Sequence, residues 1–399
     1  MADFPVKWFS SDMGGSPENG DQYGALIELL QACLVTGFNT KPIASLTYDS
    51  TTQQATASVG SGHGYLKWQV IAISGADQAG YNGEHRVTAI GSDWVRFALD
   101  TAPAATEATG DLIEIKAAPV EGWEVAAEDA ETYRIAFRRT DPRATALTLI
   151  VKNGDPKDYY SSTPSSARVA SVLWASDFID LDTYTVELGR FWPYSNNETN
   201  RDAEWIFIAD ALGLYYINKY ADPAARGLII SGDFDSVRPG DAFNCISNGI
   251  NAAASWTFND DPYPASMNFG ATSYFEICRG YNQLPGDAHA SLLGVGEKMG
   301  DSIGYPNASD NGYYVSLGRL LIREEPSGDT SSIRAGQSLR GYLPGILQPL
   351  QTSPVYDKVI IDNLPGLEGV PVLSCLVANE DDDYQGHLVA FRLDEWRGV

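Results

Sequence analysis

The sequence contains few of the residues that most often bind metals, form disulfides or act as nucleophiles. Of its 399 residues, 4 are cysteine and 4 are histidine. Cys33, Cys245, Cys278 and Cys375 are widely spaced and include no CxxC pair, and so few cysteines do not make a disulfide scaffold in a chain of this length. The pattern therefore predicts buried free thiols and no zinc site.

The histidines are equally isolated from one another. They are His63, His85, His289 and His387, and none belongs to an HxH or HxxxH pair or accompanies a GxSxG nucleophile elbow. A triad assembled from any serine and aspartate would have no specificity. We therefore expect structural histidines, and we predict no catalytic, cofactor-binding or metal-binding residue and no cofactor.

Long hydrophobic runs are absent. No apolar stretch approaches the roughly 20 residues that cross a bilayer as a helix. The first residues, MADFPVKWFSSDM, lack a basic segment followed by an apolar one, so they do not resemble a secretory signal. These two absences predict a protein that is made in a cytoplasm and does not insert into a membrane.

Positive charge is scarce as well. The chain has 27 lysine and arginine residues against 52 aspartate and glutamate residues, a formal net charge of −25 and a pI near 4.4. Binding to nucleic acid or to an anionic membrane needs a basic face, which this balance argues against. Because 44% of the residues are hydrophobic and 20% are charged, the acidity indicates a solvated surface on a folded protein rather than disorder.

The clearest secondary-structure pattern lies in residues 68–99. It contains three apolar or alternating stretches, at residues 68–73, 86–90 and 94–99. Alternation with period two is typical of half-buried strands. Between the first two stretches, Asn82-Gly83 predicts a tight two-residue turn, because both residues tolerate a positive φ. The segment is therefore predicted to form three short antiparallel strands.

One helix is predicted, near the N-terminus. Asp21 is the expected N-cap, apolar residues follow at helical spacing from Leu26 to Leu34, and Gly37 ends the helix. Only Glu28 and Gln31 are polar between residues 25 and 35. A helix this apolar packs either in its own fold or, as an anchor, on another subunit.

The remaining chain is dominated by short apolar or alternating stretches separated by glycine, proline, asparagine and aspartate. Predicted strands outside 68–99 lie at residues 43–48, 54–59, 111–116, 132–137, 146–152, 167–174, 183–187, 204–209, 213–218, 227–231, 313–323, 355–377 and 387–393. Asp210 to Gly213 predicts a hairpin turn. The predicted fold class is mainly β, with several small antiparallel β-sandwich or barrel-like modules and one N-terminal helix.

Three domains follow from this pattern. Residues 1–42 are predicted to be an N-terminal arm and helix used for attachment, and residues 43–118 a small β-module of about six strands. Residues 119–399 are predicted to be a larger β-rich domain, with a division near residue 225 as the alternative.

Acidic clusters leave two chemical alternatives open. They are Asp177 to Asp182, Asp233 with Asp235, Asp260-Asp261, and Glu380 to Asp383. Paired carboxylates can hydrolyse glycosides when they face one cleft, and several of them can hold calcium. None has the spacing of an EF-hand loop. The simpler interpretation is a set of solvated loops.

Aromatic residues are abundant, with 21 tyrosines and 9 tryptophans, and many lie in or near predicted loops. Exposed aromatic rings are a frequent basis of sugar-binding and other adhesive surfaces. The alternative is that these rings fill the cores and edges of β-sandwiches.

Two segments resemble proteins of tailed bacteriophages. Residues 73–90, ISGADQAGYNGEHRVTAI, are similar to tail and baseplate proteins in which a strand ending in SGA precedes YNG and a VT strand. Residues 10–38, SSDMGGSPENGDQYGALIELLQACLVTGF, resemble the start of virion structural proteins, where a glycine-rich loop precedes an "LI.LLDACLV.GF" helix. Shorter matches follow in the same order: Gly232-Asp233-Phe234, Pro239-Gly240-Asp241, Arg340-Gly341-Tyr342-Leu343-Pro344-Gly345 and Trp396-Arg397.

The resemblance implies a structural component of a tailed-phage virion, in the tail tip, the baseplate or an attached fibre or collar. Its expected partners are other virion proteins and copies of itself, and its expected location is the virion, after synthesis in the host bacterial cytoplasm. The alternative function is a receptor- or carbohydrate-binding module of the tail, with a host surface glycan or receptor as a further partner. A third hypothesis is a glycan hydrolase that uses Asp233 and Asp235, but the resemblance carries over no catalytic residue and we expect no enzyme.

Overall fold

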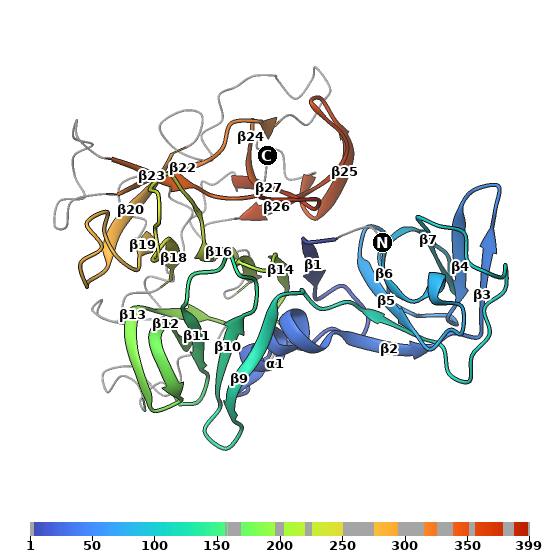
Figure 1. Cartoon of the computed structure of the whole chain (residues 1–399), viewed down its shortest axis with the longest axis horizontal. Coiled ribbons are helices and arrows are strands. Elements are labelled where there is room, and N and C mark those ends of the chain that lie inside the picture. Colours follow the sequence, from blue (N-terminus) through green and yellow to red (C-terminus); the bar gives the residue numbers. More distant parts are fainter. Residues whose placement is uncertain are drawn as a thin grey trace.

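The fold is mainly β, as the sequence predicts. The computed structural model describes residues 4–155, 158, 169–195, 203–219, 226–249, 275–293, 315–324, 338–350, 356–377 and 387–397. Within these residues the strands form four antiparallel sheets, several of them curled, and one short α-helix lies near the N-terminus (Figure 1). In the same residues, no helix has the length and apolarity needed to cross a membrane.

A seven-stranded sheet contains the segment that gave the clearest sequence pattern. Its order is β2-β8-β5-β6-β7-β4-β3, and its strands are β2 (Phe38–Pro42), β3 (Ser45–Asp49), β4 (Gln54–Ser58), β5 (Val70–Ser74), β6 (Gly83–Ile90), β7 (Trp94–Ala98) and β8 (Glu114–Ala117). The sheet lies to the right in Figure 1, beside the rest of the chain. Residues 106–109 pair with β3 and, through Thr109, with Asp77 after β5, so the sheet almost closes into a barrel.

The three predicted strands of residues 68–99 are confirmed as β5, β6 and β7, which pair antiparallel in that order. The predicted two-residue turn is wrong. Asn82 has φ −75°, and only Gly83 has a positive φ, of 111°. A 3₁₀ turn, η2 (Ala79–Tyr81), precedes them, and the Asn82 side chain accepts a hydrogen bond from the amide of Ala76 at 3.0 Å and donates one to its carbonyl at 2.6 Å. Asn82 thus closes a longer loop instead of forming a tight turn.

The predicted helix is confirmed, with a different cap. Helix α1 (Ala25–Gln31) continues into a π-helical turn, η1 (Ala32–Thr36), and ends before Gly37. The N-cap is Gly24, at φ 87°, and the prediction of Asp21 is wrong. Asn153 caps the helix from another part of the chain, because its carbonyl accepts from Gly24 at 3.0 Å and its side-chain oxygen from Leu26 at 2.9 Å. Leu26, Leu29 and Leu30 have no exposed surface, so α1 packs inside the chain's own fold.

A five-stranded meander follows the seven-stranded sheet in the chain. Its order is β13-β12-β11-β10-β9, and its strands are β9 (Trp123–Asp129), β10 (Arg134–Arg139), β11 (Thr148–Lys152), β12 (Val169–Asp180) and β13 (Thr183–Pro193). One face contributes Phe137, Leu149 and Trp174 to the large core that also contains α1. Strand β13 begins where the strand of residues 183–187 is predicted but continues to Pro193.

The largest sheet brings the N-terminus together with the second half of the chain. Its order is β1-β14-β15-β16-β18-β19-β20-β22-β23-β17, and its strands are β1 (Lys7–Ser10), β14 (Trp205–Ala209), β15 (Gly213–Lys219), β16 (Arg226–Asp233), β17 (Asp235–Ser236), β18 (Cys245–Asn248), β19 (Phe275–Ile277), β20 (Ala288–Leu293), β22 (Leu321–Glu324) and β23 (Ser338–Tyr342). Because β17 follows β16 after one residue, the pairing of β23 with β17 curls the sheet back onto its own middle.

A second five-stranded sheet completes the fold. Its order is β21-β24-β27-β26-β25, and its strands are β21 (Val315–Ser316), β24 (Ile346–Pro349), β25 (Val359–Leu364), β26 (Leu367–Val377) and β27 (His387–Arg392). Phe391 and Cys375 of this sheet join the same core as α1 and the meander. The division into domains at residues 42, 118 and 225 stays a prediction.

Candidate functional site

A buried cluster of charged side chains joins the meander to the largest sheet. Asp233, at the end of β16, is 3% exposed. One of its carboxylate oxygens accepts from the Thr145 hydroxyl at 2.9 Å and lies 2.7 Å from the Arg139 guanidinium, and the other accepts from the Thr145 amide at 2.7 Å. Asp233 therefore connects β16 to the end of β10 and to the loop before β11.

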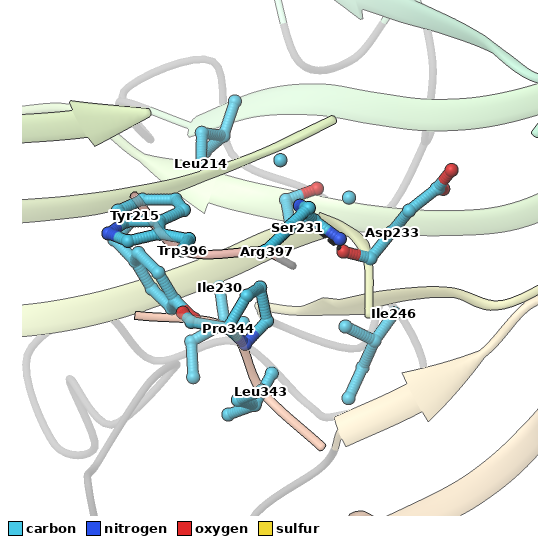
Figure 2. A pocket seen from close by; sticks show the side chains of 12 residues that line it. Leu214, Tyr215, Ile230, Ser231, Asp233, Ile246, Leu343, Pro344, Trp396 and Arg397 are labelled. Atoms are coloured by element: carbon cyan, nitrogen blue, oxygen red, sulfur yellow. Dashed lines mark hydrogen bonds between the residues drawn. The ribbon is translucent and has the colours of Figure 1, made fainter. Parts of the chain in front are cut away.

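The segment after β27 docks on the same cluster, as Figure 2 shows. Arg397 donates to the Asp210 carboxylate at 2.6 Å and to the Asp233 carbonyl at 2.7 Å, and it lies 3.4 Å from the Asp235 carboxylate. Asp210 also accepts from two amides of the β14–β15 turn, each at 2.8 Å, which confirms the predicted hairpin. Burial acts to lower the pKa of Arg397, but the carboxylates of Asp210, Asp235 and Asp233 outweigh it and raise the pKa.

Trp396 fixes this segment through apolar contacts. Its ring meets the Tyr215 ring edge-on, with centroids 5.1 Å apart, and the Tyr215 hydroxyl donates to the Pro344 carbonyl at 2.6 Å. A Cβ on Gly345 would lie 2.1 Å from the Trp396 ring, so the close approach requires glycine there. The pocket between Trp396, Arg397 and the sheet has room for about one water molecule.

A second joint attaches the seven-stranded sheet to the rest of the chain. Lys7, in β1, is 1% exposed; it lies 2.5 Å from the Glu84 carboxylate in β6 and donates to the Pro119 carbonyl at 2.6 Å. Beside it, the Trp8 indole donates to the Trp68 carbonyl at 3.2 Å. These contacts connect β1 of the largest sheet with the seven-stranded sheet. In addition, the guanidinium of Arg86 in β6 donates a hydrogen bond to the carbonyl of Leu393, which follows β27.

These joints consist mainly of residues that the sequence analysis did not single out. Lys7 and Asp210 are single charges next to apolar stretches, and Arg139 follows Arg138 at the end of one; this position is the only signal that the sequence offers for them. A charge in such a position is tolerated when it is paired, since an unpaired buried charge costs several kcal/mol, about 3–5 kcal/mol in typical cases. The sequence pattern therefore could have marked these residues as buried and paired, but it could not have named their partners.

The carboxylates proposed for glycan hydrolysis lie in this cluster. Both carboxylate oxygens of Asp233 accept hydrogen bonds from Thr145. The Asp235 carboxylate lies near the guanidinium groups of Arg397 and Arg319. This arrangement supports a structural role for Asp233. In the Asp177 to Asp182 cluster, Asp182 instead pairs with Arg134 at 2.6 Å on the surface.

No group of three or more metal-ligating side chains is found among the described residues. The other two acidic clusters, Asp260-Asp261 and Glu380 to Asp383, lie outside the described residues. Calcium binding at those clusters stays an untested alternative.

The histidines are dispersed over the fold. His63 and His85 are 4% and 7% exposed in the seven-stranded sheet and its loops, and His289 in β20 faces Glu276 at 3.3 Å. The His85 ring stacks on Phe97 and its Nε2 lies 2.9 Å from the Tyr81 carbonyl. Burial lowers the pKa of His85, so the neutral ring donates this hydrogen bond at neutral pH. His387 begins β27.

The prediction of buried free thiols is confirmed for all four cysteines.

Most of the aromatic residues in the described part of the chain are buried, although many of them lie in or near loops that the sequence predicts. In the described part of the chain, tyrosine and tryptophan mostly fill cores, and the large aromatic side chains that are exposed are Tyr133 and Tyr281, at 40% and 44%. Of the two interpretations of the aromatic content, core filling therefore accounts for most of the described rings.

No protein-family model matches the chain, and no curated protein matches its sequence. Among solved structures, the chain is similar to one described as "Phage phi92 endosialidase", with 12% sequence identity, a TM-score of 0.18, and coverage of 89% of this chain and 52% of that chain. This chain thus spans about half the length of that protein. A TM-score this low does not show a common fold, and no function follows from it.

Proposed function

We propose that the protein is a structural component of a tailed-phage virion, located in the tail tip, the baseplate or an attached fibre or collar, where it holds neighbouring subunits together. Two lines of argument support this. The sequence resembles tail and virion proteins in segments spread along the chain, and the described fold is a set of curled sheets braced against one another. Its partners are other virion proteins and copies of itself.

The observation that carries the proposal is the way in which distant segments brace the sheets. Arg139, Asp233 and Arg397 lie far apart in the sequence, yet they form one buried cluster that connects three of the four sheets. Lys7 and Glu84 connect the fourth in the same way. Such paired, buried charges hold one arrangement of the sheets, because any slippage would leave a charge unpaired away from water. A subunit that transmits load between neighbours needs this rigidity.

The proposal is tested on purified virions. The chain should be detected by mass spectrometry in a constant ratio to the capsid subunit across independent preparations. It should remain bound after washes that remove soluble host protein, which serve as the control for carry-over. Absence of the chain from virions that contain the other tail proteins would refute the proposal.

A receptor- or glycan-binding role is the second candidate, and one surface feature favours it. Tyr281 is 44% exposed, and the Arg238 guanidinium lies 5.5 Å from its ring centroid, which gives a sugar both a ring to stack on and a charged donor. Tyr281→Ala should weaken binding to host cells, while Tyr133→Ala, on the meander, should not. Equal binding by both variants and the unmodified protein would remove this candidate.

A further inference from the structure

Two of the four cysteines lie opposite each other on neighbouring strands. Strands β18 and β19 are neighbours (Figure 1). Cys245 begins β18 and Cys278 directly follows β19, and these strands pair antiparallel with Ile246 opposite Ile277. The next pair along the ladder is therefore Cys245 and Cys278. The amide of Cys278 donates a hydrogen bond to the carbonyl of Cys245 at 3.0 Å.

This placement suits a covalent bond between the two sulfur atoms. Directly opposed residues joined by backbone hydrogen bonds in an antiparallel pair have Cα atoms about 5.5 Å apart. Disulfides bridge Cα separations of about 4.4–6.8 Å, most often near 5.5–6 Å. The backbone spacing of this pair therefore suits a disulfide, so closure requires rotation of the side chains and little movement of the backbone. Cys33 and Cys375, in η1 and β26, lie in other elements.

We propose that Cys245 and Cys278 are a latent disulfide site, reduced in the cytoplasm and closed when the protein meets an oxidising environment that contains a small disulfide such as oxidised glutathione. The thiolate of one cysteine attacks a sulfur of the oxidant and releases one glutathione thiolate. The second cysteine thiolate then attacks the protein sulfur of the mixed disulfide and releases the other glutathione. The two cysteines lose two electrons and two protons, which the two glutathione molecules take up.

Burial controls the rate of this exchange. Both cysteines have no exposed surface, and burial raises the pKa of the Cys245 thiol well above its ordinary value. Because the thiolate is the attacking species, the pair stays reduced through synthesis and reacts only through local opening of the strands. The same burial shields the finished bond from reductants. The bond would tie β18 to β19 beside Asp233, which lies opposite Cys245 on the other neighbouring strand.

The experiment is a long incubation of the full chain in a buffer of oxidised glutathione, with a parallel sample refolded from denaturant in the same buffer. Both samples should lose two of the 4 free thiols when thiols are counted after unfolding. Mass spectrometry of an unreduced digest should find one cross-linked pair of peptides, which contain Cys245 and Cys278. During the incubation, the rate of thiol loss should rise about tenfold per pH unit at pH values below the thiol pKa, because the thiolate is the attacking species.

Matched variants separate this pair from the other cysteines. Cys278→Ala should abolish the cross-link, whereas Cys33→Ala and Cys375→Ala should leave it unchanged. The proposal is overturned if the refolded wild-type protein keeps four free thiols, carries glutathione without closing the bond, or cross-links Cys245 or Cys278 to a different cysteine. The inference does not depend on the proposed function, since the cross-link is measured on the isolated protein.

Discussion

At the scale of single residues, Asp233 shows how a motif from the sequence acquires a role only in the fold. In the sequence, only Phe234 separates it from Asp235, and such a pair of carboxylates is compatible with glycan hydrolysis as well as with a solvated loop. The structure separates them: the Asp233 side chain is 2% exposed and the Asp235 side chain 28%. The buried carboxylate balances Arg139, whose side chain is 1% exposed.

This difference predicts unequal effects of two matched substitutions. Asp233→Asn should destabilise the protein by about 3–5 kcal/mol, because the amide no longer balances the buried Arg139 charge. Asp235→Asn should cost less than about 1 kcal/mol, since water screens the partly exposed carboxylate. The free energy of unfolding is measured by denaturant titration. Similar values for the two variants would show that Asp233 does not brace the sheets.

At the scale of elements, helix α1 was predictable in position and type but not in its cap. The spacing of leucines fixes a helix near residues 25–35, and the helical segment found ends before Gly37. The N-terminal amides are satisfied by Asn153, which is distant in the sequence, so local capping signals pointed to the wrong residue. The predicted tight turn at Asn82-Gly83 is wrong for a related reason. Its asparagine bonds across a loop to Ala76 instead of adopting a positive φ.

The burial of α1 predicts a strong asymmetry between its two faces. Leu26→Ala should cost about 2–5 kcal/mol, because Leu26 has no exposed surface and the truncation leaves a cavity. Glu28→Ala, on the exposed side of the same helix, should change stability by less than about 0.5 kcal/mol. Both values come from chemical unfolding of the purified chain. If Leu26→Ala costs no more than Glu28→Ala, the helix does not pack inside its own fold.

At the scale of the whole molecule, the described residues form one large core, a separate core in the seven-stranded sheet, and two smaller clusters in the last sheet and in the meander. The large core unites α1, the meander, the largest sheet and part of the last sheet. The separate core contains residues such as Val87, Val95 and Phe97. The joint at Lys7 and Glu84 connects the two parts through polar contacts, and Phe38 of β2 and Ala117 of β8 add apolar contacts from the seven-stranded sheet to the large core.

Two cores connected in this way should unfold in two steps. Phe97→Ala should lower the midpoint of one calorimetric transition, with a loss of about 3–5 kcal/mol, because Phe97 is fully buried in the separate core. The other transition should keep its midpoint in this variant. A single transition that moves as a whole with Phe97→Ala would indicate that the joint makes the two cores one cooperative unit.

The pattern of residues along the chain is sufficient to predict the class of fold, the strands of residues 68–99, the helix and the buried thiols. Each of these depends on the periodicity or spacing of nearby residues, which the chain itself displays. The pattern does not predict which charges meet, which residue caps α1 or which cysteines are neighbours, because these depend on how distant segments pack. The order of the strands brings Arg139, Asp233 and Arg397 together. That order depends on contacts between segments that are far apart in the chain, and the local residue pattern does not reveal such contacts.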